Sequence, residues 1–197
     1  MLGQMDNHEQ QALDRWETLE RRLIYEHLPW LRLFSEHVRL PDGREVRDYL
    51  QIETPGYAMI VPLDEQGRIG LVRSYKRGLG DVDVQPPAGL LDPDETPLDS
   101  ARRELLEELG CVAEAWQSLG SFVLNGNYGA GWAHIYLATG CTQVQEPDPG
   151  DLEQQQVLWL SIADVREAWR SGGFRQIGAS AAIGLALDRI AGQQAGT

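Results

Sequence analysis

The stretch that decides the fold is GLLDPDETPLDSARRELLEELGC, residues 89–111. Its central part predicts a helix over 97–109. Thr96 can cap the start, with Asp99 three positions later as in a capping box, and Gly110 suits the position where the chain leaves the last turn. Apolar residues recur at helical spacing and give this helix one face that packs against the protein: Leu98, Ala101, Leu105 and Leu109.

Three glutamates share a second face of the predicted helix. Glu104, Glu107 and Glu108 stand at i, i+3 and i+4, so their carboxylates lie close together beside the apolar stripe. Like charges at this spacing repel, whereas a bound divalent cation would hold them together, and oxygen ligands suit Mg²⁺ or Mn²⁺. Arg103 can pair with Glu107 one turn on, or reach back to Glu95. The alternative is a solvated acidic face with ordinary Arg–Glu pairs.

With its preceding turn, the segment resembles the Nudix box, which reads Gly, five residues, Glu, seven residues, Arg-Glu-aliphatic-x-Glu-Glu-x-Gly-aliphatic. Cys111 stands where an aliphatic residue is usual, but cysteine is also small and apolar. The complete set of glutamates favours a hydrolase over a ligand-sensing Nudix module without catalysis. The polar and glycine positions that match are Gly89, Glu95, Arg103, Glu104, Glu107, Glu108 and Gly110.

The resemblance implies both a fold and a reaction. The fold is of the α+β class, with a mixed β-sheet sandwiched between helices, here with an N-terminal β-hairpin extension. The reaction is attack by water on a phosphorus of a diphosphate, assisted by Mg²⁺ or by Mn²⁺ in its place. The residues that the resemblance assigns to the metal are Glu104, Glu107 and Glu108 and the backbone near Ala88 and Gly89, with Glu95 and Arg103 as supports.

Similarity to one branch of the family extends over residues 30–95. This stretch looks like the N-terminal half of ADP-ribose pyrophosphatases and related nucleotide-sugar hydrolases, in which an N-terminal hairpin helps to form a dimer with shared substrate sites. The implied substrate is ADP-ribose or a nucleotide sugar, cleaved to a nucleoside monophosphate and a sugar phosphate. Dinucleoside polyphosphates or modified nucleoside triphosphates are the alternative, although minimal triphosphatases lack such an arm.

Four residues outside the box are candidates for substrate contacts. Lys76 or Arg77 could contact the diphosphate, and the alternative is that both only keep the surface soluble. Tyr128 or Trp132 could stack on a base or a ribose, although such aromatics more often pack within loops. The proline that ADP-ribose enzymes carry after the box is absent from residues 122–132, which leaves the identity of the sugar open.

The resemblance places the general base outside the box, in the acidic loop before the next strand. Glu153 is the first candidate and Asp151 the second, because Asp151-Leu152-Glu153 ahead of VLWL looks like the acidic run of that branch. A carboxylate there could activate water directly or through a metal. The alternatives are a solvated acidic loop and a base within the box, for which Glu107 is the candidate.

The rest of the chain predicts a mixture of strands and helices. Residues 8–26 suit a helix, because four apolar residues recur there at helical spacing. Strands are predicted over 30–40, 45–53, 57–63, 68–75, 116–124, 132–139 and 155–160, and further helices over 161–171 and 178–191. Residues 81–91 are predicted to be extended, with an interruption at Pro86-Pro87. We expect a helix and hairpin extension for dimerisation over 1–55, a Nudix hydrolase domain over 56–192, and a disordered tail over 193–197.

Charge and composition limit the partners. The formal net charge of −13 over 197 residues argues against nucleic acid, because an acidic surface repels phosphate backbones. Cys111 and Cys141 are too few for a disulfide framework and suit a reduced protein. The N-terminus has no apolar signal segment, and no apolar run approaches the ~20 residues that cross a bilayer. We therefore expect a cytoplasmic homodimer that acts on a small molecule, away from membranes.

Overall fold

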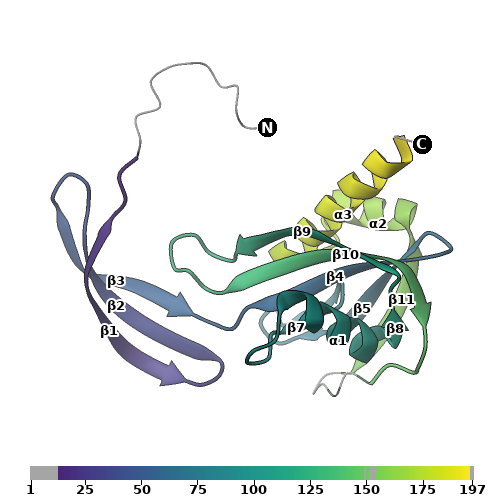
Figure 1. The fold of residues 1–197 in the computed structure, drawn as a ribbon, viewed down its shortest axis with the longest axis horizontal. Coiled ribbons are helices and arrows are strands. Elements are labelled where there is room, and N and C mark those ends of the chain that lie inside the picture. The colour runs from purple at the N-terminus through teal and green to yellow at the C-terminus, as the bar shows by residue number, and fades with distance from the viewer. Residues whose placement is uncertain (1–12, 149, 151–153, 196–197) are drawn as a thin grey trace. The chain divides into compact units, whose positions relative to one another are not determined.

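The computed structural model describes residues 13–148, 150 and 154–195 (Figure 1). The chain divides between Glu53 and Thr54 into two compact units. We call them the N-terminal unit and the C-terminal unit. None of the described helices is both long and apolar enough to cross a bilayer.

The N-terminal unit is a three-stranded antiparallel sheet in the order β1–β2–β3. The second and third strands confirm the predictions over 30–40 and 45–53. Between them the chain turns at Gly43, whose φ of 85° is a conformation that glycine adopts without strain. The strands are β1 (Glu17–His27), β2 (Leu31–Arg39) and β3 (Glu45–Glu53).

The helix predicted over 8–26 is wrong where the structure describes it. Residues 17–27 form β1, which pairs with β2 along its length, with Leu23 opposite Phe34. Helical spacing of a few apolar residues is a weak local signal, and the hydrogen bonds that β2 offers outweigh it. Residues 8–12 lie outside the described part of the chain.

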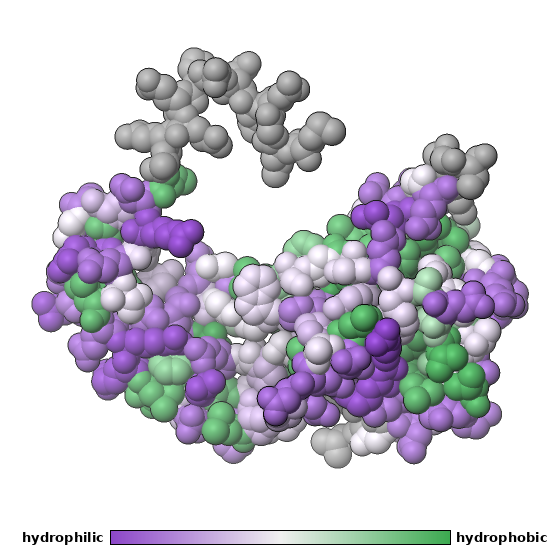
Figure 2. All heavy atoms as spheres, in the orientation of Figure 1, coloured by the Kyte–Doolittle hydropathy of each residue, from purple (hydrophilic) through white to green (hydrophobic). Residues whose placement is uncertain are grey.

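Apolar side chains reach the surface of the N-terminal unit. Leu23, Ile24 and Tyr25 on β1 are 45%, 44% and 53% exposed. Figure 2 shows hydrophobic patches among the hydrophilic residues on the visible side of this unit. Of the residues that the structure describes here, Val38 alone is buried.

The C-terminal unit is built on one mixed sheet. Its central path runs β11–β5–β4–β10–β8, with β6 beside β5, β7 beside β4 and β9 beside β10. β4 and β10 pair in parallel, and the other pairs are antiparallel. The strands are β4 (Tyr57–Asp64), β5 (Arg68–Lys76), β6 (Asp81–Gln85), β7 (Ala88–Leu90), β8 (Cys111–Val112), β9 (Ala115–Val123), β10 (Trp132–Gln143) and β11 (Gln155–Ser161).

Helices cover both faces of this sheet, as Figure 1 shows. Successive residues of β4 point to opposite faces. Ile60 belongs to a buried cluster with Leu105 of α1, and Val61 belongs to a second cluster with Ile183 of α3. The mixed sheet between helices confirms the predicted fold. The helices are α1 (Pro97–Leu109), α2 (Ile162–Arg170) and α3 (Ile177–Ala195).

The last helix extends beyond its predicted end. The sequence predicted a helix over 178–191 and a disordered tail from residue 193, whereas α3 runs to Ala195. Glutamine and alanine are good helix formers, and one glycine costs only about 1 kcal/mol, so the turn at residues 192–195 remains helical. Residues 196–197 lie outside the described part.

Candidate active site

The helix α1 begins and ends where the sequence predicts. Thr96 has extended backbone angles, and its Oγ1 accepts a hydrogen bond from the Asp99 N–H at 3.2 Å. This bond satisfies an amide that has no partner inside the helix. Gly110 has a φ of 66° and donates its N–H to the Leu106 carbonyl at 2.9 Å, which ends the helix. The two caps fix the positions of the glutamates between them.

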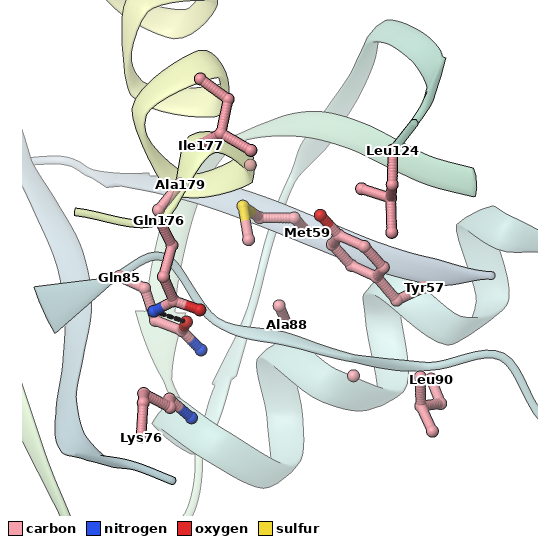
Figure 3. Close-up of a pocket in the computed structure, with 12 residues that line it drawn as sticks. Tyr57, Met59, Lys76, Gln85, Ala88, Leu90, Leu124, Gln176, Ile177 and Ala179 are labelled. Atoms are coloured by element: carbon pink, nitrogen blue, oxygen red, sulfur yellow. Dashed lines mark hydrogen bonds between the residues drawn. The ribbon is translucent and has the colours of Figure 1, made fainter. Parts of the chain in front are cut away.

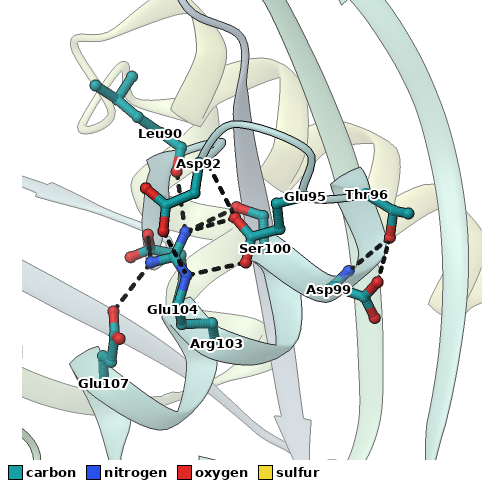
Figure 4. Close-up of polar contacts among 9 residues, drawn as sticks. All are labelled: Leu90, Asp92, Glu95, Thr96, Asp99, Ser100, Arg103, Glu104 and Glu107. Carbon is teal, nitrogen blue, oxygen red and sulfur yellow. Dashed lines mark hydrogen bonds and ion pairs between the residues drawn. The ribbon is translucent and has the colours of Figure 1, made fainter. Parts of the chain in front are cut away.

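Arg103 joins the helix to the loop that precedes it (Figure 4). Its guanidinium donates to Glu95 from Nε to Oε1 at 3.0 Å and from Nη2 to Oε2 at 2.9 Å, and to the Leu90 carbonyl at 3.0 Å. Its Nη1 donates to Glu104 at 2.6 Å and to Glu107 at 3.1 Å. One arginine therefore makes both contacts that the sequence left as alternatives, to Glu107 and to Glu95.

This network shifts the pKa values of its members. The hydrogen bonds from Arg103 hold the pKa of Glu95 below its usual 4.5, and those from Glu95 raise the pKa of Arg103. The two side chains are 14% and 27% exposed, so water screens this pair less than a pair at the open surface. The charged pair stabilises the loop against α1.

Two of the three box glutamates are buried against the backbone of β7. Glu104 and Glu108 are 8% and 4% exposed. The Ala88 N–H donates to Glu108 Oε2 at 2.8 Å, and Gln155 Nε2 donates to Glu108 Oε1 at 3.3 Å. Gly89 lies so close to Glu104 that a Cβ at this position would overlap the carboxylate. The absence of a side chain at Gly89 therefore leaves the space that the Glu104 carboxylate occupies.

The residues present fit a hard divalent cation. Glu104, Glu107 and Glu108 offer carboxylate oxygens beside the backbone of residues 88–89, and Mg²⁺ and Mn²⁺ prefer oxygen ligands. Among the described residues, no three Asp, Glu, His or Cys side chains are arranged to hold a metal ion as they stand. Arg103 bonds two of these carboxylates. A cation would have to share them with the guanidinium or displace it.

A cavity of about 520 Å³ lies beside this segment (Figure 3). Lys76, one of the two cations predicted to contact the diphosphate, lines it together with residues 88–89. The lining does not include Arg77, Tyr128 or Trp132, and the two aromatic residues are 46% and 51% exposed. The other lining residues are Tyr57, Met59, Gln85, Leu90, Leu124, Gln176, Ile177, Gly178 and Ala179.

Two glutamines in this cavity were missed by reasoning from the sequence. Gln85 ends β6 and Gln176 directly precedes α3, and the Gln176 Nε2 donates to Gln85 Oε1 at 2.9 Å. The two residues are 91 positions apart, and no local pattern marks either of them. Glutamine is mostly a surface residue, so only the packing of the chain end against the sheet identifies the pair.

The two candidates for the general base, Glu153 and Asp151, lie outside the described residues. Beyond them the chain enters β11 at Gln155, whose side chain donates to Glu108. The described part of the strand therefore contacts the acidic helix, and the roles of Glu153 and Asp151 stay predictions.

Family models match both units of the chain. The model described as the NUDIX domain matches residues 54–177. A second model, the nucleoside diphosphate sugar hydrolase N-terminal domain, matches residues 16–49. The first match covers more than half of the chain, and the chain belongs to the Nudix family.

Among curated proteins, the chain is similar to the ADP-ribose pyrophosphatase of Mycobacterium tuberculosis, with 34% identity over 134 residues. The aligned part covers 67% of this chain and 64% of that protein, which is less than two thirds of the relative. The ADP-ribose pyrophosphatase of Bacillus subtilis is 28% identical over 67% of this chain and 71% of its own length.

A third relative matches a longer part of the chain. It is the CMP-5'-(N-acetyl-N-hydroxy-3-aminopropyl)phosphonate hydrolase of Streptomyces rubellomurinus, 31% identical over 87% of this chain and 81% of that protein. Among solved structures, a crystal structure of ADP compounds hydrolase superposes with a TM-score of 0.79 at 21% identity. That match covers 92% of this chain and 97% of the other, and it supports the fold.

Proposed function

We propose that this protein is a metal-dependent pyrophosphohydrolase that cleaves ADP-ribose or a nucleotide sugar into a nucleoside monophosphate and a sugar phosphate. The observation that carries the proposal is the intact acidic helix. Arg103 holds its loop, and the buried Glu104 and Glu108 lie against the backbone that lines a substrate-sized cavity. The two ADP-ribose pyrophosphatases among the relatives support this substrate class.

The box residues have distinct roles in this proposal. Glu104, Glu107 and Glu108 would hold Mg²⁺, or Mn²⁺ in its place, with help from the backbone of residues 88–89. A cation held there would supply charge neutralisation for the diphosphate and a lower pKa for a water molecule. Arg103 positions the carboxylates of Glu104 and Glu107 through its hydrogen bonds, and Glu95 holds Arg103 in place.

The substrate contacts come from residues around the cavity and from the acidic loop. Lys76 lines the cavity and would place an ammonium near the diphosphate, with Arg77 as a second cation. Tyr128 or Trp132 would stack on a ring of the substrate. Glu153 is the proposed general base, and Asp151 is the second choice.

A homodimer belongs to the same proposal. The exposed side chains of Leu23, Ile24 and Tyr25 leave apolar surface in water that a second copy would cover. Light scattering should give about twice the chain mass of 22.0 kDa. The mass of one chain at every concentration tested would contradict the dimer.

A hydrolysis screen with Mg²⁺ tests the function. The substrates are ADP-ribose, UDP- and GDP-sugars, NADH, diadenosine polyphosphates and nucleoside triphosphates, and the products are separated by ion-exchange chromatography. We expect ADP-ribose or a nucleotide sugar to have the highest kcat/KM. Preference for polyphosphates would favour the triphosphatase alternative. Tight binding without turnover of any compound would favour a ligand-sensing module.

A further inference from the structure

The cavity has a polar side and an apolar side (Figure 3). Gln85 and Gln176 form the polar side, near Lys76, whereas Tyr57 and Met59 offer apolar surface across from them. Because the backbone of residues 88–89 belongs to the same lining, a group bound here would lie beside the position proposed for the diphosphate. The cavity is therefore suited to a flat group that has one polar edge.

Asp83 fixes which way the two amides point. Its carboxylate is 3% exposed and has no hydrogen to donate, so Gln176 must turn its Nε2 toward it, at 3.2 Å. The same Nε2 donates to Gln85 Oε1 at 2.9 Å, and this leaves Gln85 with its own Nε2 as the free end. Two consecutive hydrogen bonds thus determine where the oxygen and the nitrogen of each side-chain amide lie, which we call the polarity of the pair.

The remaining amide atoms face the cavity. Gln176 Oε1 is an acceptor and Gln85 Nε2 is a donor, and Figure 3 shows both on the same side of the pair. Among the described residues, neither atom has a hydrogen-bond partner. Gln85 is only 6% exposed, so its unpaired N–H would lose hydration when a ligand without an acceptor fills the cavity.

A fixed donor beside a fixed acceptor selects a ligand edge with the opposite arrangement. The 6-amino edge of adenine and the carboxamide of nicotinamide both present an N–H donor next to an acceptor. Sugar hydroxyls can donate or accept, so they gain nothing from a fixed polarity. The apolar side formed by Tyr57 and Met59 suits the face of an aromatic ring.

We propose that Gln85 and Gln176 recognise an amide-like edge of a ring at one end of the nucleoside diphosphate substrate, and that Asp83 is the positioning residue that sets their polarity. This inference rests on the proposed function, because it takes the ligand of the cavity to be part of a diphosphate substrate. The ring is either the amino-substituted base or a carboxamide-bearing ring, which present the same chemistry.

Binding to the full chain, measured by calorimetry with Mg²⁺ present, tests the inference. AMP is compared with IMP, which has an oxygen in place of the amino group, and nicotinamide mononucleotide is compared with nicotinic acid mononucleotide. We expect a roughly tenfold preference for the amide-like member of at least one pair. The pair that shows it identifies the ring. Equal affinities within both pairs, or no binding of any probe, overturn the proposal.

The Asp83→Asn variant tests the positioning role. Asparagine keeps the shape but can also donate a hydrogen bond, so the side-chain amide of Gln176 can exchange the positions of its oxygen and nitrogen. The preference for the amide-like nucleotide should then fall below about twofold. Asp188→Asn, on the exposed side of α3, is the matched control and should keep it. Affinity for ribose 5-phosphate, which has no amide-like edge, should not change. A preference that persists in Asp83→Asn contradicts the role of Asp83.

A second variant covers the case in which Asp83→Asn fails to fold, as judged by circular dichroism. Gln176→Met removes the acceptor at similar volume and should weaken the preferred nucleotide roughly tenfold without changing ribose 5-phosphate binding. Unchanged selectivity in Gln176→Met overturns the proposal. Selective binding without hydrolysis would refute only the proposed function, whereas hydrolysis without selectivity would refute only this inference.

Discussion

The two units of the chain are stabilised in different ways. The C-terminal unit buries one apolar cluster on each face of its sheet. In the N-terminal unit, strand pairing and exposed ion pairs such as Arg39–Glu17 connect the strands, and Val38 is the one buried residue among those described. A small sheet needs a packed apolar face for independent stability. The comparison indicates that the C-terminal unit supplies its own apolar core. The N-terminal unit, in contrast, needs apolar contacts beyond those within its own sheet to be stable.

The largest expected effect is on catalysis, where a change in the box of the C-terminal unit should matter and a change in the N-terminal unit should not. Glu108→Gln keeps the shape of a buried box residue and removes its charge, so kcat on the best substrate of the screen should fall by at least ~10²-fold. Glu17→Gln, on the exposed β1, is the control and should leave kcat unchanged. Near-normal turnover of Glu108→Gln would remove the metal role assigned to this helix face.

A second prediction compares the same truncation in both units. Leu105 is fully buried in α1, so Leu105→Ala should lower the free energy of unfolding by about 2–5 kcal/mol. Leu23 is 45% exposed, so in a single chain Leu23→Ala should change it by at most about 0.5 kcal/mol. Urea unfolding measures both. A larger, concentration-dependent loss for Leu23→Ala would indicate that a second copy covers β1.

The smallest effect concerns how stability depends on pH through two glutamates that each pair with an arginine, Glu95 and Glu45. Arg103 lowers the pKa of Glu95, so this carboxylate stabilises the fold above pH 4.5 and loses that contribution as the pH falls through its folded pKa. Glu95→Gln should therefore cost about 1–2 kcal/mol at pH 7. The difference from the unchanged protein should shrink below pH 4.5.

The control for this pair lies in the N-terminal unit. Hydrogen bonds from Arg39 and then His37 lower the pKa of Glu45 as well, but this residue is open to solvent. Water screens it, so Glu45→Gln should change the melting temperature less than Glu95→Gln does. Equal changes in the two variants, measured by calorimetry between pH 3 and pH 7, would contradict the difference between the units.

The sequence predicted best the features that depend on neighbouring residues. The start of α1 at Thr96 and its end at Gly110 follow from side-chain and backbone bonds within one turn, so the residue types alone are sufficient. Arg103 was predicted with its two partners, but that it binds both at once depends on how the loop folds back.

Features that depend on residues outside the segment itself were predicted poorly. The spacing of apolar residues in 8–26 is compatible with a helix, and only the neighbouring strand β2 makes residues 17–27 a strand. The pairing of Gln85 with Gln176 requires the end of the chain to pack on β6, which no local pattern encodes. In both cases the decisive partner lies elsewhere in the chain.

The parallel pairing of β4 with β10 has a consequence for folding. Tyr57 of β4 lies opposite Ala133 of β10, and β5 to β9 and α1 all lie between them in the sequence. Joining such distant segments loses chain entropy before their contacts form, which slows this step. The caps of α1 are local, and β4 and β7, on which it packs, precede it in the chain, so we expect this helix to pack on them before β10 is in place. The buried part of the acidic face, Glu104 and Glu108 against β7, would then be in place before the parallel pair closes.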